Sequence, residues 1–540
     1  MKLTPFSKLL IGLIIVGAIG YVAYTKYGGE LRNYARQGTG KVEDVSKDDF
    51  NQIGQLPDAP RDGTVEVTAP ASGPVGDGKL NRPLRVAINT WAGHAPGIVA
   101  NGGMDPGAAA SLYKKKYGLD VQFTLLEDPT AKLNAFIKGD VDIMWDTVDS
   151  YAREASVLAD QGKQAKSILQ EDWSRGGDGI VSLKSINSIE DLKGKKIATT
   201  QFTPSHWLLL YMLSQSGLSP QDKQEIERSL VYFDEAPKAA NAFRAKQVDA
   251  AVTWEPDLTN SVNARPDDAH ILVSTTAATN VIADTLVARQ DLINQAPKTV
   301  QDFVAGWFDG ISVMQEDPDG ANRLIGSALK LGPEDVSGML SGLKLTPFAD
   351  NAQFYGLTSQ KPYFNQIFDA AFVIWRKKGV VTKVVDAKDW QDSRFVAAVS
   401  GQYKGQKVEE SFAFKDKPKV SDRAIVNKSL SIHFTTGSDQ IMSGSYFTLD
   451  SLGETMLSFG NTFLQIEGNT DSRGNEVANK SLSQKRAQAV KKYLVDNFKI
   501  PPERFVAVGH GAANPVASNA SEDGRALNRR TDIKVVLNTQ

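Results

Sequence analysis

The sequence contains no cysteine and only five histidines among its 540 residues. The absence of cysteine excludes disulfides, thiolate metal ligands and a cysteine nucleophile, and it excludes the acylated cysteine that anchors a lipoprotein. The histidines form no close metal-ligand pair, so we expect neither a zinc site nor another cofactor. The formal net charge is only −2, and this balance gives no reason to expect nucleic acid as a partner.

Long apolar runs are also scarce, and one stands out near the start of the chain. Leu9–Thr25 is uncharged and is flanked by Lys8 and Lys26. As a helix this run would span ~26 Å, close to the ~30 Å hydrocarbon core of a bilayer. We therefore expect residues 1–27 to form an uncleaved, single-pass anchor in the inner membrane. A cleaved signal peptide is the alternative, because its basic start and apolar run look similar.

A chain of this length exceeds one hydrophobic core, and about three folded units are expected. Residues 28–82 are rich in proline, glycine, serine and aspartate and indicate a flexible linker. Residues 83–405 then alternate β-branched runs such as Leu84–Ile88 and Val121–Leu125 with helical patterns such as Ala131–Lys138. This order is typical of βαβ units with mostly parallel sheets, so we predict an α/β fold.

A quasi-repeat lies within this central region. Ala135–Asp146 aligns with Ala242–Asp257, which begins 107 residues later. Each copy contains a helix end, a Val-Asp pair, a short apolar run and a loop rich in tryptophan and acids. The repeat predicts two lobes of similar build, whose loops at the carboxyl ends of the strands face one another across a cleft.

Four segments of this region resemble periplasmic substrate-binding proteins of the nitrate, sulfonate and taurine type: Trp91–Pro96 (WAGHAP), Ala135–Asp142, Asp191–Ile197 (DLKGKKI) and Val252–Pro256 (VTWEP). The resemblance implies a two-lobed clamp in which the chain crosses between lobes near Gly179–Leu183 and Val281–Val287. It also implies that the ligand meets the loops that contain Trp91, Thr147, Thr203, Ser205 and Trp254. Glu255 follows Trp254 directly, and we include it among the candidate ligand-binding residues.

The start of a predicted helix in this region suits an anion. Thr203 is a good N-cap, Pro204 fits the first helical position, and Gly217 fits a helix end. Free backbone N–H groups at this helix start, together with the hydroxyls of Thr203 and Ser205, would hold an oxyanion if they face the cleft. A plain helix cap is the alternative.

Aromatic and acidic residues on the same loops suit a cation instead. They are Trp91, Trp145, Trp173, Trp254, Asp146, Asp149, Asp172, Glu255 and Asp257. Tryptophan faces with nearby carboxylates attract amines and quaternary ammonium ions, although such side chains also serve as lobe packing. The sequence does not decide between the two ligand classes, and we rank the oxyanion first.

The stretch from Phe463 onward has a different pattern. An apolar run, Phe463–Ile466, predicts a strand, and Asn475–Asn497 has helical spacing. On this helix Asn479, Ser483 and Arg486 would share one face, opposite the apolar one. Asp471 leaves the strand end just ahead of the helix. A carboxylate and a guanidinium that converge in this way suit a zwitterion, because Asp471 can hold an ammonium while Arg486 holds a carboxylate.

These residues resemble the peptidoglycan-binding domain of the OmpA family. Its pattern is present as Gly468–Gly474 (GNTDSRG), Asn479–Ala487 (NKSLSQKRA) and the closing Gly524–Arg530 (GRALNRR). The resemblance implies that Asp471 and Arg486, fifteen residues apart, clamp the diaminopimelate of the cell-wall stem peptide. The other residues it implies at the site are Thr470, Asn479 and Arg529. Asn469 stands where the family usually has histidine, and we expect this to tune the site.

We assign residues 427–540 to this domain and residues 406–426 to a second linker. The expected elements are strands at Ser429–Phe434, Phe505–Val508 and Ile533–Leu537, the last closing the sheet, and a helix at Tyr446–Phe459. The predicted architecture is therefore a transmembrane helix, a two-lobed binding-protein fold and a smaller α/β OmpA-like domain.

Three functions fit this architecture. The first is an inner-membrane protein, with its bulk in the periplasm, that binds a small solute, tethers to peptidoglycan and serves a transporter or an envelope complex in the membrane. The second is a structural bridge between membrane and cell wall with a vestigial cleft. An enzyme ranks last because the sequence offers no nucleophile–base pair, metal cluster or phosphate loop.

Overall fold

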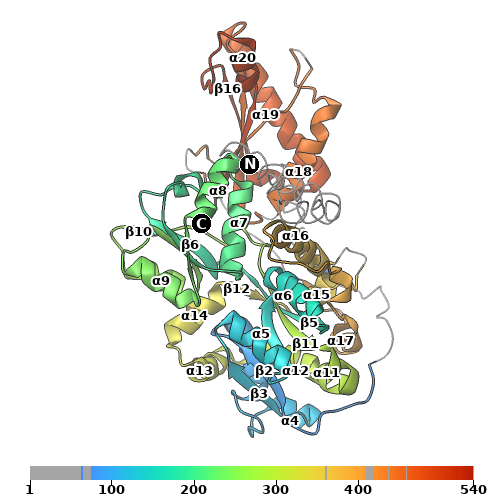
Figure 1. Cartoon of the computed structure of the whole chain (residues 1–540). Helices are drawn as coiled ribbons and strands as arrows, with labels where there is room; N and C mark the ends of the chain where they lie inside the picture. The colour runs from blue at the N-terminus through green and yellow to red at the C-terminus, as the bar shows by residue number, and fades with distance from the viewer. Residues whose placement is uncertain are drawn as a thin grey trace, which may run out of the picture. The chain divides into compact units, whose positions relative to one another are not determined.

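The computed structural model describes residues 63–64, 75–358, 362–408, 419–421, 424–435, 437–457 and 459–538. The predicted anchor, residues 1–27, lies outside this part of the chain, as do most of residues 28–82 and 406–426. Within the described ranges no helix is both long and apolar enough to cross a membrane. These ranges form a two-lobed α/β domain and, later in the chain, a smaller α/β domain (Figure 1).

The first lobe is built on a six-stranded sheet. Its strands are β2 (Leu84–Ile88), β3 (Val121–Leu125), β4 (Ile143–Thr147), β5 (Ala165–Ser174), β11 (Ala283–Arg289) and β12 (Leu343–Leu345). Their order in the sheet is β12-β5-β11-β4-β2-β3. Strand β2 is parallel to β3 and β4, whereas β11 is antiparallel to β4 and β5. The first helices of this lobe are α3 (Ala95–Asn101), α4 (Leu112–Tyr117), α5 (Pro129–Lys138) and α6 (Val148–Asp160).

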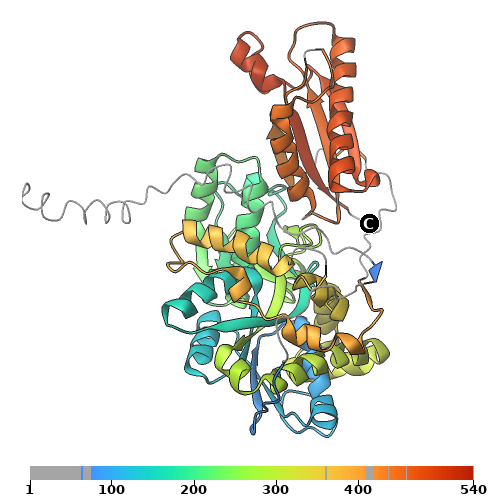
Figure 2. The ribbon, with the colours of Figure 1, turned by 90° about the vertical axis from the view of Figure 1, so that its right-hand side faces the viewer.

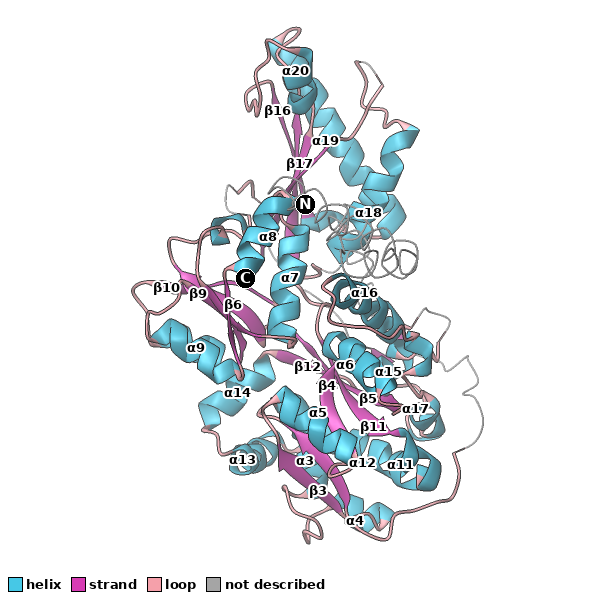
Figure 3. Cartoon of the chain, in the orientation of Figure 1, coloured by secondary structure: helices cyan, strands magenta, loops and turns pink. Residues whose placement is uncertain are grey.

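The second lobe is built on a five-stranded sheet. Its strands are β6 (Asp178–Leu183), β7 (Ile197–Thr200), β8 (Leu230–Phe233), β9 (Ala250–Trp254) and β10 (Ala269–Ser274). Its helices are α7 (Pro204–Gln215), α8 (Pro220–Arg228), α9 (Ala236–Arg244) and α10 (Asp257–Asn263). The strand order is β10-β6-β9-β7-β8, and α7 and α9 lie on different sides of the sheet (Figure 3).

The two sheets share one plan, as the quasi-repeat predicted. Parallel strands in the order β3-β2-β4 are followed by antiparallel β11 in the first lobe, and parallel β8-β7-β9 are followed by antiparallel β6 in the second. The two copies of the repeat contain α5 with β4 and α9 with β9. Such parallel strands need crossover helices, and these helices supply the alternating pattern seen in the sequence.

The chain crosses between lobes at residues 175–177, from β5 to β6, and at residues 275–282, from β10 to β11. The crossings expected at Gly179–Leu183 and Val281–Val287 lie mostly inside β6 and β11, so this prediction is displaced by a few residues. The chain stays extended where it passes from one sheet to the other, so no local sequence pattern marks the crossing.

After β11 the chain returns to the first lobe and adds a mostly helical layer. It consists of α11 (Gln290–Gln295), α12 (Pro297–Glu316), α13 (Pro318–Leu329), α14 (Pro333–Ser341), α15 (Phe348–Phe354), α16 (Tyr363–Lys377) and α17 (Arg394–Ala398). Buried aromatic rings hold this layer in place; Tyr113 of α4, for example, stacks on Phe303 of α12 with 5.5 Å between ring centroids. Burial of such rings is the main stabilising contribution of the core.

Parts of both predicted linkers contact the folded domain. Leu80 donates its backbone N–H to Thr299 at 2.9 Å, and Arg82 pairs with the buried Asp142 at 2.6 Å. The short strands β1 (Gly63–Thr64) and β13 (Lys407–Val408) pair in an antiparallel manner. The ordered domain therefore begins before residue 83, because residues 79–82 bind to its surface.

The C-terminal domain has a four-stranded sheet. Its strands are β14 (Val426–Leu430), β15 (Thr462–Asn469), β16 (Phe505–Gly511) and β17 (Thr531–Leu537), and its helices are α18 (Tyr446–Leu457), α19 (Glu476–Phe498) and α20 (Glu522–Asn528). The order is β14-β17-β15-β16. The last strand, β17, completes the sheet by inserting between β14 and β15.

Helix α19 lies directly on this sheet, as Figure 2 shows. Gly468 and Gly509 are neighbours in β15 and β16. A Cβ atom added to Gly468 would lie 2.3 Å from the Ser483 carbonyl oxygen, and one added to Gly509 would lie 2.2 Å from the Gln484 backbone nitrogen. The helix can approach this closely only because both strands lack a side chain there.

Ser483 fills this contact. It is fully buried and its hydroxyl accepts a hydrogen bond from the Gly511 N–H at 2.9 Å. The buried face of α19 consists of Ser483, Ala487, Val490 and Leu494. The prediction that Ser483 lies opposite the apolar face is therefore wrong. That prediction rested on the polarity of the side chain, whereas the close approach of the helix to Gly468 and Gly509 requires a small residue at this position.

Candidate functional site

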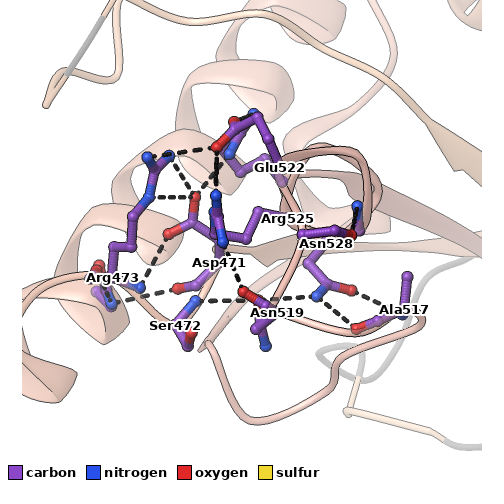
Figure 4. Close-up of polar contacts among 12 residues, drawn as sticks. Asp471, Ser472, Arg473, Ala517, Asn519, Glu522, Arg525 and Asn528 are labelled. Atoms are coloured by element: carbon purple, nitrogen blue, oxygen red, sulfur yellow. Dashed lines mark hydrogen bonds and ion pairs between the residues drawn. The ribbon is translucent and has the colours of Figure 1, made fainter.

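Asp471 lies just beyond the end of β15 and is almost buried. Its Oδ2 accepts hydrogen bonds from Arg529 Nη1 at 2.7 Å and Arg473 Nη2 at 2.9 Å, and its Oδ1 accepts one from the Arg473 backbone N–H at 3.0 Å (Figure 4). Burial raises the pKa of this carboxyl, but the hydrogen bonds from Arg473 and Arg529 outweigh it and lower the pKa to about 2. Asp471 is therefore a carboxylate at neutral pH.

Arg486 reaches the same region from α19 without pairing with Asp471. Within the described residues no ion pair joins the two; Arg486 Nε donates to the Ser438 carbonyl at 3.0 Å, and its guanidinium lies 4.8 Å from the centroid of the Phe434 ring. Burial, followed by the nearby charge of Arg529, lowers the pKa of Arg486. Its two Nη groups donate no hydrogen bond within the described part of the chain and are free to bind an anion.

The neighbouring candidates shape the turn. Asn479 Nδ2 donates to the Arg473 carbonyl at 2.9 Å, and the Thr470 backbone N–H donates to the Gly511 carbonyl at 2.8 Å. Asn469 is buried and its amide donates to Asp532 Oδ2 at 3.1 Å, so it faces the sheet and not the charged pair. These residues fix the chain path that presents Asp471.

Sequence reasoning missed two charged residues here. Arg473 is the direct partner of Asp471, and Glu522 at the start of α20 accepts from Arg529 Nη2 at 2.9 Å. Figure 4 shows Asp471, Arg473 and Glu522 in one network that also contains Arg525. The position of Arg473, two residues after Asp471, was the available signal, because an aspartate readily binds groups two residues further on.

A small cleft lies between the two lobes, with about 20 Å³ of free volume, enough for a single water molecule. Its lining consists of Asn89, Trp91, Trp145, Thr147, Asp178, Pro204, Trp254, Ile282 and Asp284. Most of these residues stand at or just after the carboxyl ends of the parallel strands β2, β4, β7 and β9. This edge is where open α/β sheets bind ligands.

The candidate residues of the cleft divide into two groups. Trp91, Thr147 and Trp254 line it, whereas Thr203, Ser205 and Glu255 do not. The Thr203 hydroxyl donates to the Thr200 carbonyl at 2.6 Å and makes no cap. Ser205 is fully buried beside Pro204, which does line the cleft.

Two further residues proposed from their type have local roles instead. The Glu255 carboxylate accepts hydrogen bonds from the Thr259 N–H at 3.0 Å and the Thr259 hydroxyl at 2.6 Å. Trp173 packs edge-on against Phe354 with 5.8 Å between ring centroids, so it belongs to lobe packing. Asp178 and Asp284 were missed because they stand in the strands next to the two crossings, where no motif marks them.

The cleft adjoins a cluster of buried carboxyl groups: Asp149, Glu171, Asp172, Asp178 and Asp284. Burial raises the pKa of both Asp149 and Asp178 to about 7. Burial and the charge of Glu171 raise the pKa of Asp172, and burial and the charge of Asp172 raise that of Asp284. No group of three or more histidine or acidic residues in the described part of the chain could hold a metal ion.

Comparisons with known proteins agree with this two-domain architecture. Residues 433–529 match the model of the OmpA family, and residues 108–321 match the model described as NMT1/THI5 like. Outer membrane porin F of Pseudomonas aeruginosa is 36% identical over 111 residues, which are 21% of this chain and 32% of that protein. The chain thus spans about a third of the length of the porins that it matches.

The central region is similar to other proteins. The taurine-binding periplasmic protein of Escherichia coli K12 is 25% identical over 298 residues, which are 53% of this chain and 87% of that protein. The solved structure of the periplasmic aliphatic sulphonate binding protein from Escherichia coli has a TM-score of 0.46 and 17% identity, and it covers 59% of this chain and 100% of its own. The chain therefore carries an NMT1/THI5-like domain and, at its C-terminal end, a domain of the OmpA family.

Proposed function

We propose that this protein holds peptidoglycan with its C-terminal domain and binds a small solute with its two-lobed domain. The carrying observation is the arrangement of Asp471, Arg486 and Arg529. Asp471 is an ionised carboxylate at neutral pH, and Arg486 keeps two Nη groups available beside it. A diaminopimelate residue carries an ammonium and a carboxylate on the same carbon, and these charges match the two sides of the site.

Arg473 would compete with a ligand ammonium for the carboxylate of Asp471. In the structure Arg473 donates to Asp471 Oδ2 through both Nε, at 3.2 Å, and Nη2, at 2.9 Å. A ligand ammonium would bind to the same oxygen and share it with or displace this exposed side chain. Arg529, tied to Glu522, stays in place and keeps the carboxylate oriented.

The cleft supports the second half of the proposal. Its lining comes from both lobes, and the chain connects the lobes through residues 175–177 and 275–282. Rotation about such crossings closes the lobes of a two-lobed protein around a solute. We further propose that residues 1–27 anchor the protein in the inner membrane, with the two domains in the periplasm and a transporter or envelope complex as the membrane partner.

The test is binding of the full chain to purified diaminopimelate-type peptidoglycan. Asp471→Ala and Arg486→Ala each remove one charge-assisted contact of about 1.5–3 kcal/mol, so each should weaken binding about 10- to 150-fold. Lys485→Ala is the matched control, because it removes a positive charge from an exposed position of α19 next to Arg486. Thermal unfolding of each variant checks that the domain is still folded. Full binding by both clamp variants would refute the proposal.

A further inference from the structure

The cleft between the lobes combines aromatic rings with carboxylates. Three tryptophans and two aspartates, Trp91, Trp145, Trp254, Asp178 and Asp284, make up five of its nine lining residues. The lining contains no lysine, arginine or histidine among the described residues. We propose that this cleft binds a small organic cation, an alkylammonium or quaternary ammonium ion. The inference rests on the proposed solute-binding function and names the class of solute.

One acid that lines the cleft has an oxygen without a hydrogen-bond donor among the described residues. Asp178 is 3% exposed; its Oδ2 accepts from the Ser174 hydroxyl at 2.7 Å, but its Oδ1 has no hydrogen-bond partner in the described part of the chain. Asp172 is fully buried; its Oδ2 accepts from Trp91 Nε1 at 3.0 Å, and its carboxyl is also hydrogen-bonded to that of Asp284. A buried acceptor without a donor is costly, and a bound cation would relieve this cost.

Two basic side chains of the first lobe already have acidic partners. Lys132 is buried and its Nζ lies 3.1 Å from Glu154 and 3.3 Å from Asp146. His94 lies between Glu171, at 2.6 Å, and Asn89, at 2.7 Å. The two pairs leave Asp149, Asp172, Asp178 and Asp284 without a basic partner among the described residues. A ligand cation would provide the missing positive charge.

Trp91 and Trp145 offer the cleft their rings, because their indole N–H groups already have acceptors. Trp91 donates its Nε1–H to Asp172 and Trp145 donates its Nε1–H to the Leu126 carbonyl, both at 3.0 Å. The ring of Trp145 already carries a cation, because Lys132 Nζ lies 4.5 Å from its centroid. Indole rings beside carboxylates attract ammonium groups, and methylated ammonium ions in particular, through their quadrupoles.

An oxyanion fits these groups less well. Only Pro204 of the α7 start lines the cleft, and the Thr203 hydroxyl is bound to the Thr200 carbonyl. An anion at this helix start would lie in the same small space as Asp178, and the ionised form of this carboxyl would repel it. A metal ion is not favoured either, because no described group of acids and histidines has the arrangement that a metal requires.

The experiment is isothermal titration calorimetry on the full chain with two ligands of nearly equal shape. Choline carries a quaternary ammonium, and 3,3-dimethylbutan-1-ol replaces that charged nitrogen by carbon. We expect choline to bind at least about tenfold more tightly than the alcohol. Ethanesulfonate and nitrate serve as the oxyanion arm, and butylamine serves as the primary ammonium arm.

Variants then locate the binding site. Asp178→Asn keeps the shape of the side chain and removes its charge, and it should weaken choline binding at least about tenfold. Asp284→Asn should also weaken choline binding. Asp267→Asn changes an exposed position of the second lobe and should leave choline binding unchanged. Because the comparison of choline with its neutral isostere uses the unaltered protein, it remains decisive even if a variant fails to fold.

The outcomes separate the two proposals. Binding of choline or butylamine with loss in Asp178→Asn supports the inference. Binding of ethanesulfonate or nitrate without either cation would overturn the inference and leave the solute-binding function intact. Equal binding of choline and its neutral isostere would also overturn it. Binding of none of these ligands would overturn the inference, and the absence of small molecules co-purifying with the protein would then count against solute binding itself.

Discussion

Replacing Gly509 by alanine tests the contact that holds α19 against the sheet. A Cβ atom at this position would lie 2.2 Å from the backbone nitrogen of Gln484 and 2.7 Å from its Cα. Non-bonded carbon atoms pack at about 3.5–4.0 Å, so the helix would have to retreat by more than about 1 Å. A 23-residue helix cannot make this adjustment at one residue alone.

The size of the effect follows from two contributions. Overpacking a close contact costs about 1–3 kcal/mol. The same movement stretches the hydrogen bonds from Gly509 N–H to Gln484 Oε1, at 2.8 Å, and from Gly511 N–H to the Ser483 hydroxyl, at 2.9 Å. Each such bond contributes about 0.5–1.5 kcal/mol. We therefore expect Gly509→Ala to lower the free energy of unfolding of the C-terminal domain by about 2–4 kcal/mol.

Hydrogen–deuterium exchange of the full chain measures this change locally, because protection of the amides in α19 and β16 reports the opening free energy of that domain. Gly444→Ala is the matched control: a Cβ atom there would meet nothing within 4 Å, so the change should stay within about 0.5 kcal/mol. Peptidoglycan affinity should fall with Gly509→Ala, since Arg486 follows Gln484 by two residues. Unchanged protection in α19 and β16 would refute the close contact.

Three other predictions concern the two-lobed domain. Burial raises the pKa of Asp178 to about 7, so its carboxyl is mostly neutral at pH 6 and mostly ionised at pH 8. Choline affinity should therefore rise from pH 6 to pH 8, and binding should release protons. Calorimetry in buffers of different ionisation enthalpy measures this release. Lys132→Met leaves Glu154, 3.1 Å from Lys132 Nζ, buried without its cation and should lower the free energy of unfolding in urea by about 3–5 kcal/mol. An unchanged urea midpoint would contradict this pairing. At Gly177 an added Cβ would lie 2.1 Å from Trp91 Cη2, so Gly177→Ala should displace the indole and weaken choline binding about 3- to 30-fold, while peptidoglycan binding stays the same.

Local sequence patterns predicted the strands, the helices and the shared plan of the two lobes. Leu84–Ile88 and Val121–Leu125 are strands with the expected bounds, and the helix expected at Asn475–Asn497 appears as α19. Its start is marked by Asn475, whose side chain accepts from the Ala478 N–H at 3.1 Å. These features depend on neighbours within a few residues, namely alternation, helical spacing and capping, so the local sequence contains them.

Which distant residues contact one another depends on the fold as a whole. The sequence placed Asp471 and Arg486 in one region, but Asp471 pairs with Arg473 and Arg529, the latter 58 residues away. It also gave no sign that β17 enters the middle of the sheet. The partner of a charged group and the neighbour of a strand depend on chain segments that are distant in sequence, and several alternatives satisfy the same local pattern.

The cleft shows the same division. Trp91 and Trp254 lie in motifs and were found from the sequence, whereas Asp178 and Asp284 come from the strands beside the two crossings and were not. Their meeting requires both lobes to fold and the chain to pass between them twice. Every chain segment that reaches a site contributes to its charge, whereas a local sequence pattern describes one segment only. Sequence motifs therefore located the cleft, and the fold determined which acidic residues line it.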